Sequence, residues 1–146
     1  MYDLMIIGSG PAGISAALTA KARNLNFIWF GSRALSTKIE KAEKIMNYPG
    51  LPAVTGSEMQ SVFLKQIDDC GITITESQVN SIYDCGGYFA AGADNEIYEA
   101  KAVIMTVGMT TTREIEGEAR LLGCGVSYCA TCDGAVSYTH LTLPTT

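Results

Sequence analysis

The stretch Tyr2-Asp-Leu-Met-Ile-Ile-Gly-Ser-Gly-Pro-Ala-Gly13 decides the fold, because it joins a short apolar run directly to a glycine-rich loop. Tyr2–Ile7 has the nearly continuous apolar pattern of a strand buried on both faces of a parallel sheet. The next segment, Ile14–Arg23, is rich in helix formers and ends before Asn24. A second apolar run, Asn26–Phe30, predicts another strand. Together these segments predict a β-α-β unit with a right-handed crossover.

The loop between the first strand and the helix has the G-x-G-x-x-G spacing of a dinucleotide site. Gly8 permits a tight turn, Gly10 lets a pyrophosphate approach the backbone, and Gly13 lets helix and strand pack closely. Pro11 suits the first helical turn, since it has no amide proton to leave unsatisfied. The free amides and partial positive charge of the helix N-terminus then attract phosphate. An ordinary tight turn is the alternative interpretation.

One residue expected of such a site is missing. An acidic side chain at the end of the second strand would bind the adenosine ribose, but this chain has Phe30-Gly31-Ser32 there. Ser32 or a backbone group is the candidate substitute.

A second motif, Cys129-Ala-Thr-Cys132, lies about a hundred residues after the loop. Two thiols at this spacing can form a disulfide, and a dinucleotide cofactor such as FAD can supply the electrons that reduce it. A helix starting near them would favour the thiolate. Asp133 could pass a proton to the departing thiolate or could cap a helix. The two motifs together predict a flavin-dependent disulfide reductase.

Two metal sites compete with this interpretation. Cys124, Cys129 and Cys132 match the first three ligands of plant-type iron–sulfur proteins, but no fourth cysteine follows. Adding His140 would give a Cys3His zinc set. Neither metal explains the glycine loop, so no metal ligand is assigned.

The middle of the chain predicts one helix and a set of strands. Thr55-Gly-Ser-Glu58 can form a capping box, and Gly71 ends the helix. Its apolar stripe is expected in the core: Met59, Val62, Phe63, Ile67 and Cys70. Residues 33–54 lack a clear period, which is typical of a functional or mobile segment.

Three or four short strands should form an antiparallel meander: Ile72–Thr75, Val79–Tyr83, Tyr88–Ala91 and Ile97–Ala100. Cys85-Gly-Gly87 and Asp94-Asn95 supply the turns. Ala102–Val107 is expected to be another buried strand that ends at Gly108. The predicted fold class is α/β, a Rossmann-like domain with a parallel sheet and an antiparallel β-meander.

Composition excludes several classes of protein. A chain of 146 residues can bury one core, and its net charge of −5 argues against nucleic acid as a partner. No apolar run approaches the roughly 20 residues of a membrane span. The N-terminus lacks a secretory signal, and five cysteines suit a fully paired secreted framework poorly. We therefore expect a cytoplasmic protein in which Cys70 and Cys85 are ordinary packing or surface residues.

The chain resembles the N-terminal part of a low-molecular-weight, bacterial-type thioredoxin reductase, of the pyridine nucleotide-disulfide oxidoreductase family. The resemblance covers Met1 to Gly134. It is carried by the first strand and glycine loop together with Asn47-Tyr-Pro-Gly50, Thr106-Val-Gly108, Glu116-Gly-Glu118 and Gly125-Val-Ser-Tyr-Cys-Ala-Thr-Cys-Asp-Gly134.

The resemblance implies a homodimeric flavoenzyme that passes electrons from NADPH through FAD to the cysteine pair and then to thioredoxin. Cys132 matches the flavin-facing thiol, Cys129 the thiol that attacks thioredoxin, and Asp133 the proton donor. Asn47 matches a polar contact to the flavin side of FAD, and Thr106 with Gly108 a strand end beside the cofactor. The implied cofactor-binding residues are Gly8, Ser9, Gly10, Pro11, Ala12, Gly13, Asn47, Val79, Thr106 and Gly108.

The chain departs from this family in three ways. The segment Thr37–Met46 lacks the usual Gly-Gly-Gln and is similar to clostridial-type relatives, some of which take electrons from ferredoxin. Residues 1–114 match the first part of an FAD-binding domain and 115–134 the start of an inserted redox/nucleotide domain. The FAD-binding domain is therefore expected to be incomplete at the C-terminus and to have exposed sheet edges. The chain alone is expected to be inactive. Residues 135–146 do not resemble the family and are expected to be a non-native tail. A non-catalytic flavin-binding fragment is the alternative function.

Overall fold

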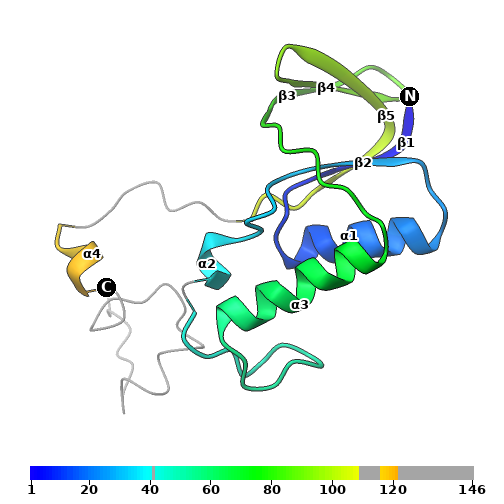
Figure 1. The fold of residues 1–146 in the computed structure, drawn as a ribbon. Coiled ribbons are helices and arrows are strands. Elements are labelled where there is room, and N and C mark those ends of the chain that lie inside the picture. The colour runs from blue at the N-terminus through cyan, green and yellow to red at the C-terminus, as the bar shows by residue number, and fades with distance from the viewer. Residues whose placement is uncertain (41, 109–115, 122–146) are drawn as a thin grey trace, which may run out of the picture. The chain divides into compact units, whose positions relative to one another are not determined.

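The computed structural model describes residues 1–40, 42–108 and 116–121. The chain divides into two units: Met1–Lys44 with Val54–Gly108, and Ile45–Ala53 with Met109–Thr146. The second unit contains a short helix, α4 (Glu118–Leu121). The elements of the first unit are β1 (Tyr2–Ile7), α1 (Pro11–Ala22), β2 (Phe27–Phe30), α2 (Thr37–Glu40), α3 (Gly56–Asp69), β3 (Val79–Asp84), β4 (Phe89–Ala93) and β5 (Glu96–Met105) (Figure 1).

The five strands of the first unit form one mixed sheet in the order β2-β1-β5-β4-β3. β1 pairs in parallel with β2, with Leu4 opposite Phe27, and with β5 on its other side. The predicted β-α-β unit is confirmed, because α1 connects these parallel strands. Leu4–Ile7 are all buried, as expected of a strand covered on both faces. α1 lies against β1 and β5, and α3 lies beside α1 (Figure 1).

The predicted boundary between Ala100 and Ala102 is wrong, because β5 runs unbroken from Glu96 to Met105. Its first half pairs antiparallel with β4, and its second half pairs in parallel with β1. Lys101 interrupts the apolar pattern without ending the strand, because its ammonium lies 2.7 Å from the carboxylate of Asp3 on β1. β5 therefore joins the parallel half of the sheet to the meander.

The last part of β5 is not the buried strand that was expected. Ile104, Met105 and Val107 expose 40%, 62% and 61% of their surface. Among the described residues, β5 beyond Ala100 is paired on one edge only, because the first residue of β4, Phe89, lies opposite Ala100. Period and hydropathy predicted a strand here but could not show that a second partner is missing.

The meander contains three strands, β3, β4 and β5, which is the smaller of the two predicted numbers. Ile72–Thr75 forms no regular strand and instead makes one parallel bridge, between Thr75 and Phe30 on β2. The Thr75 amide donates to the Trp29 carbonyl at 2.7 Å, and the Gly31 amide donates to the Thr75 carbonyl at 3.1 Å. This segment thus extends the opposite, parallel edge of the sheet. The two predicted turns are confirmed, with positive φ at Gly86, Gly87, Asp94 and Asn95.

The predicted capping box of α3 is confirmed in both directions. The Glu58 amide donates to Thr55 Oγ1 at 3.2 Å, and the Thr55 amide donates to Glu58 Oε2 at 2.8 Å. Gly71 follows the helix with a φ of +60°. Met59, Phe63 and Ile67 are buried, but the prediction is wrong for Val62 and Cys70, which are exposed at the edges of the stripe.

The irregular segment after β2 contains one turn of helix, α2, that the sequence did not predict. Four residues are too few to show a helical period. Gly56 at the start of α3 lies directly against the Ile39 carbonyl, where any Cβ would clash. None of the helices in the described ranges is long and apolar enough to cross a membrane.

Candidate functional site

The N-terminus of α1 supplies the predicted phosphate-binding groups. Gly10 is the N-cap and Pro11 is the first helical residue, as the sequence predicted. The first helical bond runs from the Ile14 amide to the Gly10 carbonyl at 3.0 Å. Within the described part of the chain, the amides of Ala12 and Gly13 show no hydrogen bond. The first turn contains no acidic residue, so these amides and the helix dipole can act together on an anion.

The start of the loop is fixed by groups from two other strands. Gly8 has a φ of +111°, a conformation that favours glycine. Its carbonyl accepts a hydrogen bond from Trp29 Nε1 on β2 at 2.8 Å and another from Thr106 Oγ1 at 3.0 Å. A Cβ on Gly13 would overlap the same carbonyl and would lie 2.8 Å from Thr106 Oγ1. The ends of β1, β2 and β5 thus hold the loop in one position.

Sequence reasoning missed Trp29 as a residue of this site. Its side chain is almost completely buried, at 1% exposure, and a buried indole N–H needs an acceptor. A single tryptophan at the end of a predicted strand, one residue before Phe30, was the available signal.

Ser9 joins the loop to the turn that follows β2. It is buried, and its hydroxyl accepts from the Ser32 amide at 2.9 Å while donating to the Leu35 carbonyl at 3.2 Å. Both capacities of this hydroxyl are therefore used within the protein, which leaves the Ser9 backbone for a ligand. A Cβ on Gly31 would lie 2.5 Å from Ser9 Cβ, so the end of β2 has no room for a side chain.

Gly10 differs from the other loop glycines in facing open space. A Cβ built on it meets no atom within 4 Å, although its φ of −72° would suit any residue. Protein packing therefore gives no reason for glycine at this position. A ligand that approaches the backbone does give one, and the pyrophosphate of a dinucleotide fits this arrangement.

The remaining predicted cofactor residues are described within their own units. Thr106 is half-buried and donates to the Ile7 carbonyl at 2.9 Å as well as to Gly8. Gly108 follows with a φ of +69°. Val79 begins β3 and packs against the buried core of the sheet. Asn47 is exposed and belongs to the second unit.

The predicted redox residues Cys129, Cys132 and Asp133 lie outside the described residues, as do Cys124 and His140 of the alternative metal sites. Over the described ranges, no group of histidine, cysteine and acidic residues could hold a metal ion. Cys70 and Cys85 are both exposed thiols, and Cys85 lies in the predicted turn.

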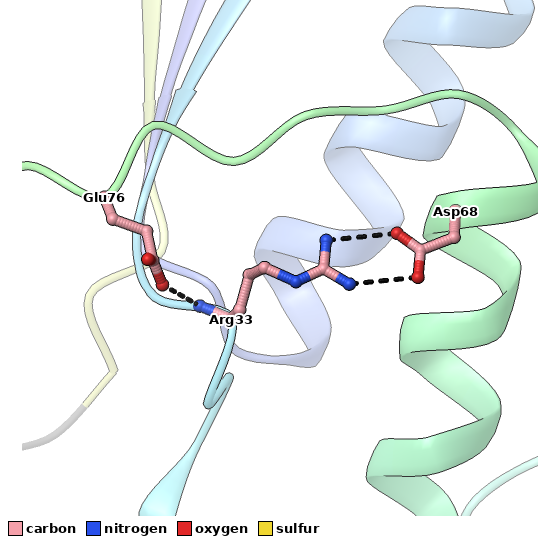
Figure 2. Close-up of polar contacts among 3 residues, drawn as sticks. All are labelled: Arg33, Asp68 and Glu76. Atoms are coloured by element: carbon pink, nitrogen blue, oxygen red, sulfur yellow. Dashed lines mark hydrogen bonds and ion pairs between the residues drawn. The ribbon is translucent and has the colours of Figure 1, made fainter.

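Three charged residues gather where β2 ends (Figure 2). The Arg33 guanidinium donates two hydrogen bonds to the Asp68 carboxylate on α3, at 2.9 and 3.0 Å. These bonds lower the pKa of Asp68 and raise the pKa of Arg33. The Arg33 amide donates to Glu76 Oε1 at 2.7 Å. α3 also holds this turn through Gln60 Nε2, which donates to the carbonyls of Ala34 and Ser36.

Comparison with known proteins agrees with this architecture. The chain is 32% identical to the thioredoxin reductase of Bacillus subtilis over 136 residues, which cover 92% of this chain and 43% of that protein. Among solved structures, a ferredoxin-flavin thioredoxin reductase from Clostridium acetobutylicum is 47% identical with a TM-score of 0.74, covering 92% of this chain and 47% of that one. Thioredoxin reductase from Streptococcus pyogenes is 35% identical with a TM-score of 0.78, covering 93% and 45%.

The chain thus spans less than half the length of the relatives it matches, and it corresponds to their N-terminal part. Residues 2–139 match the family described as pyridine nucleotide-disulphide oxidoreductase. Together with the Rossmann-like fold and its glycine loop, this match shows that the chain belongs to that family.

Proposed function

We propose that this chain is the FAD-binding part of a thioredoxin reductase-type flavoprotein. Two observations carry the proposal together: the open space at Gly10, and the amides of Ala12 and Gly13, which make no hydrogen bond in the described part of the chain. An arrangement of this kind binds a pyrophosphate through backbone amides and the helix dipole. Membership of the family and similarity to thioredoxin reductases support FAD as the dinucleotide.

Each residue of the proposed site has a distinct task. Gly8 and Gly13 shape the loop, Gly10 admits the pyrophosphate, and the amides after Pro11 bind it. Val79, Thr106 and Gly108 of the first unit would contact the rest of the cofactor. FAD, when bound, would supply two-electron redox chemistry for reduction of a disulfide.

The cysteine pair would carry the electrons to thioredoxin. In the dithiol state, the Cys129 thiolate attacks one sulfur of the thioredoxin disulfide, and the other thioredoxin sulfur leaves as a thiolate. Asp133 would protonate that leaving group. Cys132 then attacks Cys129 Sγ, which releases reduced thioredoxin and forms the Cys129–Cys132 disulfide. Residues 1–114 would belong to the FAD-binding domain and 115–134 to the start of an inserted domain, in a whole protein that is a cytoplasmic homodimer.

The proposal is tested by flavin binding with a Gly10→Ala variant. The purified chain should bind FAD, measured by quenching of flavin fluorescence on titration. Because the new methyl group meets no protein atom, Gly10→Ala should change the free energy of unfolding by about 1 kcal/mol at most. It should weaken FAD binding at least ~10-fold by blocking the pyrophosphate. Gly92→Ala on β4 is the control and should bind FAD as the wild type does. Equal FAD affinity in all three proteins would refute this site.

Ferredoxin is a second candidate for the electron donor, in place of NADPH. The chain is 47% identical to a ferredoxin-flavin thioredoxin reductase, against 32–35% for two proteins named only as thioredoxin reductases. The absence of Gly-Gly-Gln from Thr37–Met46 points the same way. In the whole protein, bleaching of the bound flavin by reduced ferredoxin but not by NADPH would favour the first donor, and the reverse result would favour the second.

A further inference from the structure

The end of β2 and the segment before β3 place a carboxylate at the same edge of the sheet as the glycine loop. β1 and β2 are parallel, so their carboxyl ends share one edge, and the loop begins at that edge with Gly8. Thr75 bridges Phe30, the last residue of β2, in the parallel direction. Glu76 follows this bridge immediately, so it also emerges at the carboxyl edge of the sheet.

The position that usually supplies a ribose-binding carboxylate has no room for a side chain in this chain. A dinucleotide fold places an acidic residue at the end of the second strand. Here that position is Gly31, and any Cβ on it would lie 2.5 Å from Cβ of the buried Ser9. Ser9 cannot turn aside without losing its bonds to Ser32 and Leu35. An acid for the ribose must therefore come from another segment.

Glu76 is held with one oxygen engaged and the other available. Its Oε1 accepts from the Arg33 amide at 2.7 Å, which fixes the carboxylate two residues beyond Gly31. Its Oε2 has no hydrogen-bond partner among the residues that the structure describes. A carboxylate in this state can accept a further hydrogen bond from a hydroxyl.

Arg33 attracts the Glu76 carboxylate, but its guanidinium is hydrogen-bonded to Asp68 and not to Glu76. Both of its terminal guanidinium nitrogens bind the two oxygens of Asp68, and Figure 2 shows the side chain extending toward α3. The backbone of Arg33 thus orients Glu76 while the side chain is bound elsewhere. We propose that Glu76 accepts a hydrogen bond from the adenosine ribose of the dinucleotide, in place of the missing acid at the end of β2. This inference rests on the proposed FAD site.

The test uses the intact chain and two ribose probes, ADP and 2′-deoxy-ADP, with FAD titrated in parallel. Calorimetry should show that the wild type prefers ADP to 2′-deoxy-ADP about 10-fold, as expected for a hydrogen bond to a charged group. Glu76→Gln keeps an acceptor for the Arg33 amide but loses the charge, and its preference should fall to about 2-fold with an unchanged melting temperature. Glu99→Gln, an exposed change on β5, should keep the wild-type preference.

The outcomes separate this inference from the proposed function. Binding of FAD with an undiminished ribose preference in Glu76→Gln overturns the role of Glu76 alone. Loss of the preference in Ser32→Ala but not in Glu76→Gln would assign the ribose to Ser32 and overturns it too. Failure of the wild type to bind FAD or ADP would overturn both proposals. A fall in preference confined to Glu76→Gln supports the inference.

Discussion

The two halves of the sheet follow different rules, although β5 runs through both. In the parallel half, Leu4–Ile7 of β1 are all buried. In the antiparallel half, β3 has no fully buried residue, β4 has two, Ala91 and Ala93, and the first half of β5 has one, Ala100. α1 lies against β1 and β5 of the parallel half (Figure 1), and buried residues of the meander, Ala91 and Ala93, share one core cluster with Met5 and Phe30. The comparison shows that the candidate site follows β1, the strand of the sheet with the most buried residues in a row.

The loops of the two halves also differ in whether distant or neighbouring residues hold them. The Gly8 carbonyl is held by Trp29 and Thr106, which come from two other strands. The β3–β4 turn is held locally, by the Cys85 amide donating to the Tyr88 carbonyl at 2.9 Å. Substitutions in the glycine loop should therefore lower the stability of the whole domain, whereas substitutions in the meander should have only local effects.

The largest difference in stability is expected when one glycine in each half is replaced by alanine. Gly13→Ala should lower the free energy of unfolding by about 3 kcal/mol and abolish FAD binding, because its Cβ overlaps the Gly8 carbonyl, a backbone atom that cannot rotate away. Gly92→Ala should change stability by only about 1 kcal/mol, since its nearest neighbour is the Ser81 hydroxyl at 2.9 Å. Urea denaturation measures both, and equal losses would show that the two halves are equally constrained.

A smaller effect is expected from removing one hydrogen-bond donor in each half. Trp29→Phe deletes the N–H that donates to Gly8 and should cost about 1–2 kcal/mol, with weaker FAD binding because the loop loses a support. Tyr98→Phe removes an exposed bond to Glu96 and should have little effect. The urea midpoints of the two variants make the comparison. A Trp29→Phe protein as stable as the wild type would contradict the role given to the indole.

The smallest effect concerns the ion pair that links β1 to β5. The pKa of Asp3 is lowered, first by the hydrogen bond from Lys101 and then by the Asn26 amide. A carboxyl with a lowered folded-state pKa contributes stability above its unfolded pKa, and this contribution disappears as the pH falls through the folded value. Asp3→Asn and Lys101→Gln should each flatten the loss of stability below about pH 4. Melting temperatures from pH 6 to pH 2 that fall as steeply as those of the wild type would disprove this.

Much of the parallel half could be predicted because its signals are local. The apolar run, the glycine spacing, Pro11 and the capping box of Thr55 and Glu58 each depend on a few neighbouring residues, and the structure confirms them. The errors fall where a distant partner decides the outcome. Lys101 was taken as a strand boundary because its partner Asp3 is 98 positions away. The assigned roles of Cys129, Cys132 and Asp133 stay predictions.

The sequence by itself determined that this chain forms a β-α-β unit with a glycine-rich loop, because strand, turn and helix signals follow one another without a gap. Only the tertiary structure decided which segments meet around that loop. Period and composition do not encode strand partners, so they could not place Thr75 beside Phe30 or Trp29 against Gly8. Such long-range contacts depend on the order of the strands in the whole sheet. They leave no room for a side chain at Gly31, after the end of β2, and they bring Glu76 to the Arg33 amide.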